Sequence, residues 1–109
     1  EYDIGIAGFE SGTDAGIASE LSQALQRILA AKAPGMRVGI VSSGTPRAGA
    51  RLMLAGSLIR LEHSYRVTAR LIDAKSSKII TMTSVTMENR DGVESTGKKI
   101  ADTLAKAIY

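Results

Sequence analysis

The sequence lacks cysteine and tryptophan, and its 109 residues include one phenylalanine, three tyrosines, two prolines and one histidine. Without cysteine the chain can form no disulfide, no thiolate zinc site and no cysteine nucleophile, whereas its compartment stays open. With so few aromatic side chains, the core must be aliphatic. The same scarcity argues against the aromatic platforms on which many proteins stack single-stranded nucleic acids.

Long apolar runs are also missing, since no stretch approaches the roughly 20 residues that a membrane-spanning helix needs. The chain opens without the basic and apolar pattern of a signal peptide. It begins at Glu1 rather than at an initiator methionine. We therefore expect a mature or trimmed form, in which contact with a membrane would need an N-terminal anchor that this chain does not contain.

What is present is the composition of an ordinary globular protein, with 44% hydrophobic and 23% charged residues. At this length a single domain covering residues 1–109 is expected. The net charge of +3 suggests an anionic neighbour without requiring one.

Hydrophobic periodicity divides the chain into helices and strands. Amphipathic stripes predict helices over 14–33 and 92–108. Apolar runs predict strands over 2–9, 36–40, 52–61, 65–73 and 78–88. Thr45 followed by Pro46 predicts a short helix up to Ala50. The first strand, helix and second strand favour a right-handed βαβ unit, and the last three strands favour an antiparallel meander.

The predicted fold class is therefore α/β, or more narrowly α+β, as a two-layer sandwich. Its elements follow the order strand, helix, strand, short helix, three strands, helix, and its mixed sheet has about five strands. Both main helices are expected on one face of the sheet, because two apolar stripes need one apolar surface to cover. The side chains expected at that contact are Leu21, Leu25, Ile28, Ile100 and Leu104.

Local signals predict how the elements begin and end. Thr13 or Asp14 is the expected N-cap of the first helix. Asp91, followed three residues later by Glu94, has the form of a capping box for the second helix. Asp73 is expected to form the turn after its strand by accepting backbone hydrogen bonds from residues 75–77.

The polar turns of the meander suggest a register for its strands. If both turns close at the polar residues, the opposed pairs are Leu61 with Tyr65, Ile59 with Val67 and Leu71 with Ile80. These residues then share the helix-covered face with Ala55, Ala69 and Met82. The opposite face collects Leu54, Leu58, Arg60, Arg66, Arg70, Ile72 and Ile79. Apolar side chains on an uncovered face indicate a contact surface.

We accordingly expect partner binding by Leu54, Leu58, Arg60, Arg66 and Arg70. On this register, Leu58→Asp should weaken the contact and leave the domain folded.

Three stretches carry a resemblance to a known family: residues 4–9 (IGIAGF), 49–58 (GARLMLAGSL) and 65–74 (YRVTARLIDA). Their order is similar to the amino-terminal domain of TolB and to CsgG, FlgO, PelC and LpoB. They resemble the family's opening strand, the start of its meander and a meander strand. Two positions depart from the pattern. Gly8 replaces a proline, and Ser76-Ser77 replaces Thr-Gly, so that turn must close without glycine.

The resemblance implies a bacterial cell-envelope protein, in the periplasm or on the periplasmic side of the outer membrane. Its expected function is that of a non-enzymatic interaction or assembly module, of the secretion, flagellar or cell-wall-associated lipoprotein type. It would bind a protein partner or associate with itself. The family offers no catalytic residues to transfer to this chain.

Other signals favour simple structural roles. Gly8, Gly12 and Gly16 do not have the spacing of a phosphate-binding loop. His63 beside Glu62 is expected in a solvated turn, because the two side chains cannot define a metal site. We predict no catalytic residue, no cofactor and no metal. The alternative function is a small basic nucleic-acid-binding domain that uses the arginines of the sheet face. Nucleic acid is the less favoured partner, because that face has no aromatic residue.

Overall fold

Five strands and two α-helices make up the part of the chain that the computed structural model describes, residues 2–12, 14–40 and 50–108. The elements are β1 Tyr2–Glu10, α1 Ala15–Lys32, β2 Val38–Ile40, β3 Ala50–Arg60, β4 Tyr65–Asp73, β5 Ile79–Met87, a 3₁₀ turn Arg90–Gly92 and α2 Val93–Ile108. The predicted order of these elements is confirmed. The short helix predicted from Thr45 lies outside the described residues.

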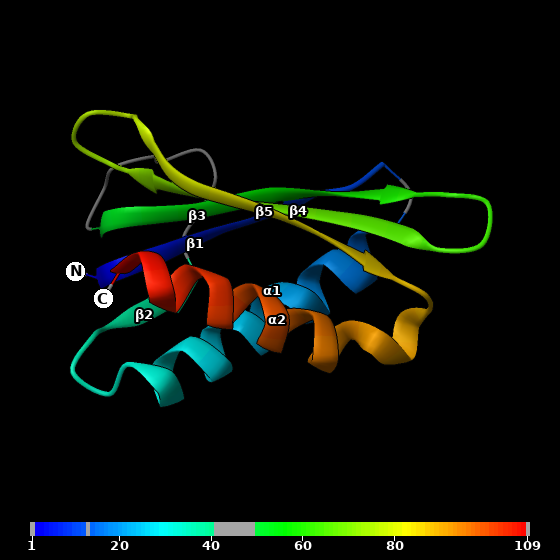
Figure 1. Ribbon diagram of the computed structural model, residues 1–109, viewed down its shortest axis with the longest axis horizontal. Coiled ribbons are helices and arrows are strands. Elements are labelled where there is room, and N and C mark those ends of the chain that lie inside the picture. Colours follow the sequence, from blue (N-terminus) through cyan, green and yellow to red (C-terminus); the bar gives the residue numbers. More distant parts are fainter. Residues whose placement is uncertain (1, 13, 41–49, 109) are drawn as a thin grey trace.

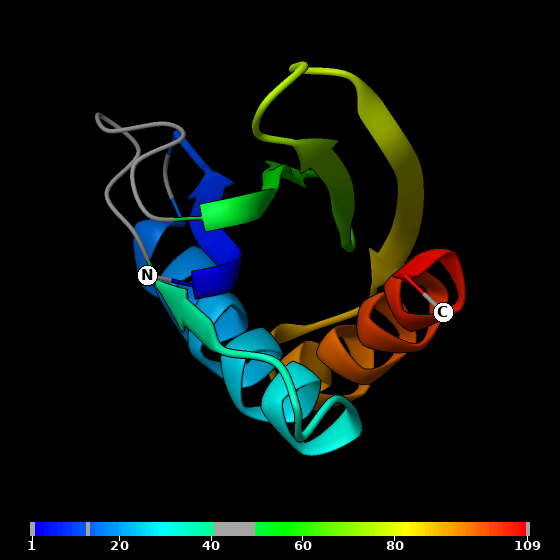
Figure 2. The same ribbon diagram turned by 90° about the vertical axis from the view of Figure 1, so that its left-hand side faces the viewer.

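The strands form one mixed sheet in the order β2-β1-β3-β4-β5. β1 is parallel to both β2 and β3, and β3, β4 and β5 form the predicted antiparallel meander. Both helices lie against the same face of the sheet (Figure 1). Seen from the end, the sheet curves around the core and the helices close the opposite side (Figure 2). The two-layer α+β sandwich is therefore confirmed.

The core between the two layers is aliphatic. Leu21 and Leu25 of α1 and Ile100 and Leu104 of α2 are fully buried, as predicted, and Ile28 packs partly buried against them. Burying an aliphatic side chain of this size stabilises a fold by roughly 1.5–3 kcal/mol relative to leaving it in water. The two apolar helix stripes therefore fix which face of the sheet is covered.

The register of β3 against β4 differs by one residue from the predicted register. Leu58 lies opposite Val67, where Ile59 was expected. The reason lies in the turn, since Leu61 leaves the strand and donates its N–H to the Ser64 carbonyl oxygen at 2.8 Å. Because alternate side chains point to opposite faces, this shift reverses the whole of β3. The prediction of which β3 side chains face the helices was therefore wrong.

Leu54 and Leu58 consequently belong to the core, where they are 0% and 4% exposed. In β5 a bulge pairs Leu71 with Thr81 and Ile72 with Ile79. Ile80 and Met82, which were expected under the helices, are therefore exposed. Leu58→Asp would place a carboxylate in the core and unfold the domain, so it cannot serve as a surface probe.

Phe9, the one phenylalanine of the sequence, is buried against Gly56 of β3. β1 carries a bulge between Ile6 and Gly8, and Gly8 adopts a φ of +100°, a value that suits glycine. Beyond the bulge Phe9 lies opposite Gly56. A Cβ on Gly56 would lie 2.6 Å from Phe9 Cε2 and would also collide with the Thr68 carbonyl oxygen. Gly56 is thus required by close packing.

Gly56→Ala should destabilise the domain by about 1–3 kcal/mol or more, because neither the Phe9 ring nor the β4 backbone can move freely. Gly97 of α2 offers a control with the same substitution. A Cβ there would meet Ile28 Cδ1 at 3.4 Å, which is ordinary contact, and alanine favours a helix over glycine by about 0.8–1 kcal/mol. Urea unfolding should move the two midpoints in opposite directions. Equal midpoints would contradict this account of Gly56.

Two ion pairs join α1 to α2. Arg27 Nη1 and Nη2 donate to Glu94 Oε1 and Oε2 at 2.6 and 2.7 Å, and Lys32 pairs with Asp102. These partners lower the pKa of both carboxyls, chiefly through the hydrogen bonds from Arg27 and Lys32. The capping box expected between Asp91 and Glu94 does not form, because Glu94 is bound to Arg27. The Asp91 N–H donates instead to the side chain of Asn89.

The double substitution Glu94→Gln with Asp102→Asn should lower the melting temperature slightly at pH 7. Carboxyls whose pKa is lower in the folded state stabilise it fully above their unfolded pKa values, near 4. This stabilisation is lost as the pH falls through the pKa values that the two carboxyls have in the folded state. The difference in melting temperature between wild type and variant should therefore shrink towards zero between about pH 5 and pH 2. A difference that stayed constant over this range would refute the role of these pairs.

Candidate functional site

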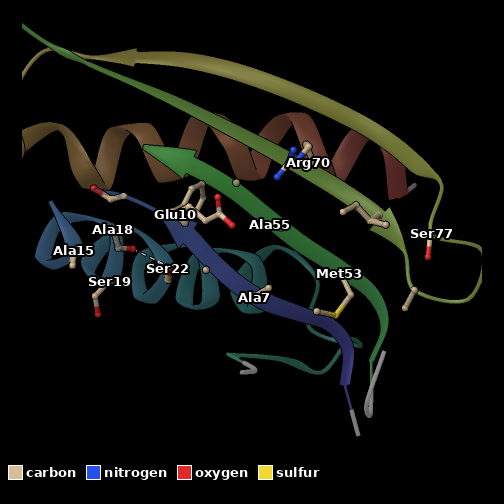
Figure 3. Close-up of a pocket in the computed structure, with 16 residues that line it drawn as sticks. Ala7, Glu10, Ala15, Ala18, Ser19, Ser22, Met53, Ala55, Arg70 and Ser77 are labelled. Atoms are coloured by element: carbon tan, nitrogen blue, oxygen red, sulfur yellow. Dashed lines mark hydrogen bonds between the residues drawn. The ribbon is translucent and has the colours of Figure 1, made fainter. Parts of the chain in front are cut away.

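A groove of about 1040 Å³ runs from the connection between β1 and α1 to the helix-free side of β3 and β4 (Figure 3). Its lining residues come from β1, the β1–α1 connection, α1, β3, β4 and the turn between β4 and β5. Eleven of the sixteen are alanine, glycine or serine. The five larger ones are Phe9, Glu10, Met53, Arg70 and Ile72. The groove is thus mostly a smooth surface of small side chains with two charged groups.

One wall is a stripe of small residues on α1: Ala15, Ala18, Ser19 and Ser22. Their spacing places them on one side of a helix. The buried Ser22 hydroxyl donates to the Ala18 carbonyl oxygen at 3.1 Å, so its hydrogen bond lies within the helix. This stripe was not predicted from the sequence as part of a site. The sequence does contain a signal for it, because small side chains recur there at spacings of three and four residues.

The far end of the groove is formed by the turn after β4. Asp73 Oδ1 accepts hydrogen bonds from the backbone N–H groups of Lys75 and Ser76 at 2.8 and 3.2 Å, which confirms its predicted role. Ser77 adopts a φ of 62° at the position where a glycine is common. The turn therefore closes without glycine, as the sequence required.

Arg70 is the cationic group of the groove. On β4 it lies opposite Ala55 of β3 and Met82 of β5, so its cross-strand neighbours carry no acceptor side chain. Its Nε is buried and has no hydrogen-bond partner among the described residues. Arginine stays charged in proteins, and its N–H groups can only donate. The described part of the chain thus leaves a buried donor of Arg70 without an acceptor.

The five residues expected to bind a partner are divided by the observed register. Arg66 and Arg70 lie on the helix-free face, whereas Leu54 and Leu58 lie in the core. Arg60 is opposite Tyr65, on the helix side, with its Nη1 4.0 Å from Asp14 Oδ1. The expected row of three arginines on one face is therefore wrong.

An apolar strip nevertheless lies on the helix-free face next to Arg70. It consists of Ile72, Ile79 and Met82, of which Ile79 is 57% and Met82 60% exposed. The placement of Ile72 and Ile79 on this face is confirmed, because they lie opposite one another at the end of β4 and β5. Met82 was expected on the other face. The uncovered face therefore carries apolar side chains among polar ones, as expected, but they are partly different residues.

Other features of the described residues bear on the kind of site. They contain no group of three or more histidine, aspartate and glutamate side chains able to hold a metal ion. His63 is fully solvated in the β3–β4 turn, 3.7 Å from Glu62. None of the described helices combines the length and the apolar character needed to cross a membrane.

Arg70→Met should change the free energy of unfolding by less than about 1 kcal/mol, because it removes a buried donor that makes no hydrogen bond. Leu71→Ala, one residue further on the core face, should lose about 2–5 kcal/mol. Thermal and urea unfolding of the two variants will separate a residue kept for binding from one kept for folding. A large loss in Arg70→Met would show that Arg70 holds the sheet together.

No protein-family model matches the chain, and no curated protein matches its sequence. Solved structures do match. TolB from Acinetobacter baumannii superposes with a TM-score of 0.71 at 14% identity, over 96% of this chain and 27% of that one. The PelC dodecamer from Paraburkholderia phytofirmans gives 0.65 at 17% identity, over 95% and 84%. XCC0632 from Xanthomonas campestris gives 0.64 at 8% identity, over 97% and 85%.

This chain spans about a quarter of that TolB chain and most of the PelC chain. At identities this low the likeness concerns the fold alone. The resemblance inferred from residues 4–9, 49–58 and 65–74 is confirmed at that level: the chain has the fold shared by TolB, PelC and XCC0632.

Proposed function

We propose that this domain is a non-enzymatic protein-binding module of the bacterial cell envelope. It docks a second copy of itself or another protein on the helix-free face of its sheet. The proposed location is the periplasm or the periplasmic side of the outer membrane. The fold shared with TolB and PelC supports this assignment, and the PelC structure is a dodecamer.

The observation that carries the proposal is the apolar strip beside Arg70. Ile79 and Met82 expose more than half of their surface. Covering their exposed surface would be favourable, and contiguous apolar patches on soluble proteins mark interaction sites. Arg70 borders the strip, opposite Met82, and can select a partner of complementary charge.

Two features support binding rather than catalysis. The hydroxyls of Ser11 and Ser22 in the groove are engaged in local hydrogen bonds, Ser11 accepting from the Asp14 N–H at 2.9 Å. Among the groove residues, no histidine lies beside these hydroxyls to act as a base. The structure weakens the alternative of nucleic-acid binding, since Arg60 lies on the helix side of the sheet and Arg66 and Arg70 lie on the other side.

Met82→Asp should weaken self-association at least tenfold, because it places a charge in the strip. Sedimentation velocity between about 10 μM and 1 mM covers the affinities expected of a weak contact. Thr86→Asp is the matched control, since Thr86 is exposed on the same strand and lies opposite Arg66, outside the strip. Both variants should unfold at the same temperature as wild type. A wild-type protein that stays monomeric throughout would rule out docking of a second copy.

A further inference from the structure

We propose that the groove beside Arg70 binds an extended peptide segment of a protein partner through a single carboxylate, from an aspartate or glutamate side chain. This inference rests on the proposed function and names the chemistry of the partner. It assigns a ligand class to the groove, whereas the apolar strip would take the adjoining surface of the same partner.

The carboxylate is indicated by the unpaired donor of Arg70. Arg70 Nε is buried, and no described residue supplies an acceptor for it. The Nε–H and one Nη–H of a guanidinium form a planar fork that fits the two oxygens of a carboxylate. A buried donor without a partner is unfavourable, and a shift of the Arg70 side chain would let Nε meet an acceptor in the groove that this residue lines. The positive charge of Arg70 favours a carboxylate there over a neutral apolar group.

The acceptor must come from outside the sheet. The cross-strand neighbours of Arg70 on either side are Ala55 and Met82, neither of which has an oxygen in its side chain. Along β4, on the same face, Arg70 is followed by Ile72 and preceded by Thr68. The Thr68 hydroxyl lies 3.5 Å from that of Ser84 and gives Arg70 Nε no hydrogen bond. Glu10 also lines the groove, yet no ion pair joins it to Arg70 within the described part of the chain (Figure 3).

The shape of the groove favours a peptide over a free small anion. Its volume of about 1040 Å³ is far larger than a carboxylate or phosphate group needs. The small side chains of α1 and of the β1–α1 connection allow a main chain to approach closely. Ile72 provides most of the apolar contact beside the charged end, since Phe9 and Met53 line the groove with only 8% and 7% of their surface exposed. A free anion would leave these contacts unused.

Glu10 restricts the charge of the segment. Its carboxylate is exposed in the same groove as Arg70 and repels a second negative group. The favoured segment therefore carries one acidic residue, with neutral or basic residues on the side that lies near Glu10. Such an arrangement selects against uniformly acidic peptides.

The test is a display library of random peptides of about ten residues, long enough to extend over roughly 33 Å. The domain has a longest dimension of 37 Å, so such peptides can extend over most of its length. Recovered peptides are synthesised and their affinity is measured by fluorescence polarisation. We expect an acidic residue at one aligned position, and an at least tenfold loss of affinity when it is replaced by asparagine or glutamine.

Variants of the protein give the matching result. Arg70→Gln should weaken binding at least tenfold, and Arg70→Lys should give an intermediate loss, because it keeps the charge without the fork. Glu10→Gln should strengthen binding. Arg66→Gln, four residues away on the same face but outside the groove, is the matched control and should bind like wild type. Should Arg70→Gln fail to fold, the substitution in the peptide still decides the question.

Several outcomes would overturn the inference. These are the recovery of no peptide, of peptides without a shared acidic residue, or of peptides whose affinity is unchanged in Arg70→Gln. Displacement of a bound peptide by inorganic phosphate, at concentrations where acetate has no effect, would identify a phosphate site instead. Peptides that lose affinity in Met82→Asp but not in Arg70→Gln would leave the proposed function standing and remove only the role of the groove.

Discussion

The pairing of β3 with β4 determines which side chains this domain buries and which it presents. Leu58 lies opposite Val67, so Leu54 and Leu58 face the helices and Ile59 faces outward. The same pairing places Arg70 between Ala55 and Met82. A slip by one residue would exchange the two faces and expose the core residues of β3. The core and the proposed binding face therefore depend on one register.

The groove depends in turn on how closely β1 and β3 approach. The bulge at Gly8 turns Phe9 onto Gly56, where there is no room for a side chain. This contact places the Phe9 ring in the core. It also leaves the small residues of α1 and of the β1–α1 connection as the groove wall. Stability and the candidate site thus rest on the same backbone geometry.

The helices, strands and turns were predicted well from the sequence because each depends on residues that are close together in the chain. The apolar stripes of α1 and α2 and the turn at Asp73 depend only on residues a few positions apart. The register could not be predicted in the same way, since it depends on whether Leu61 continues the strand or closes the turn with Ser64. The groove was missed for a related reason. Its walls come from six segments that are spread along the sequence, and its key donor, Arg70, is distinguished by what surrounds it in space.

The packing of α2 has a consequence for how the domain forms. Arg27 and Glu94 are 67 positions apart, and α2 packs on both α1 and β5. Contacts between distant parts of a chain form slowly, because a long loop must close before they are made. Part of the inner face of the sheet therefore stays uncovered until α2 has emerged from the ribosome and docked. Until then Leu21 and Ile28 of α1, which lie next to Gly97 of α2, lack the cover that this helix gives them.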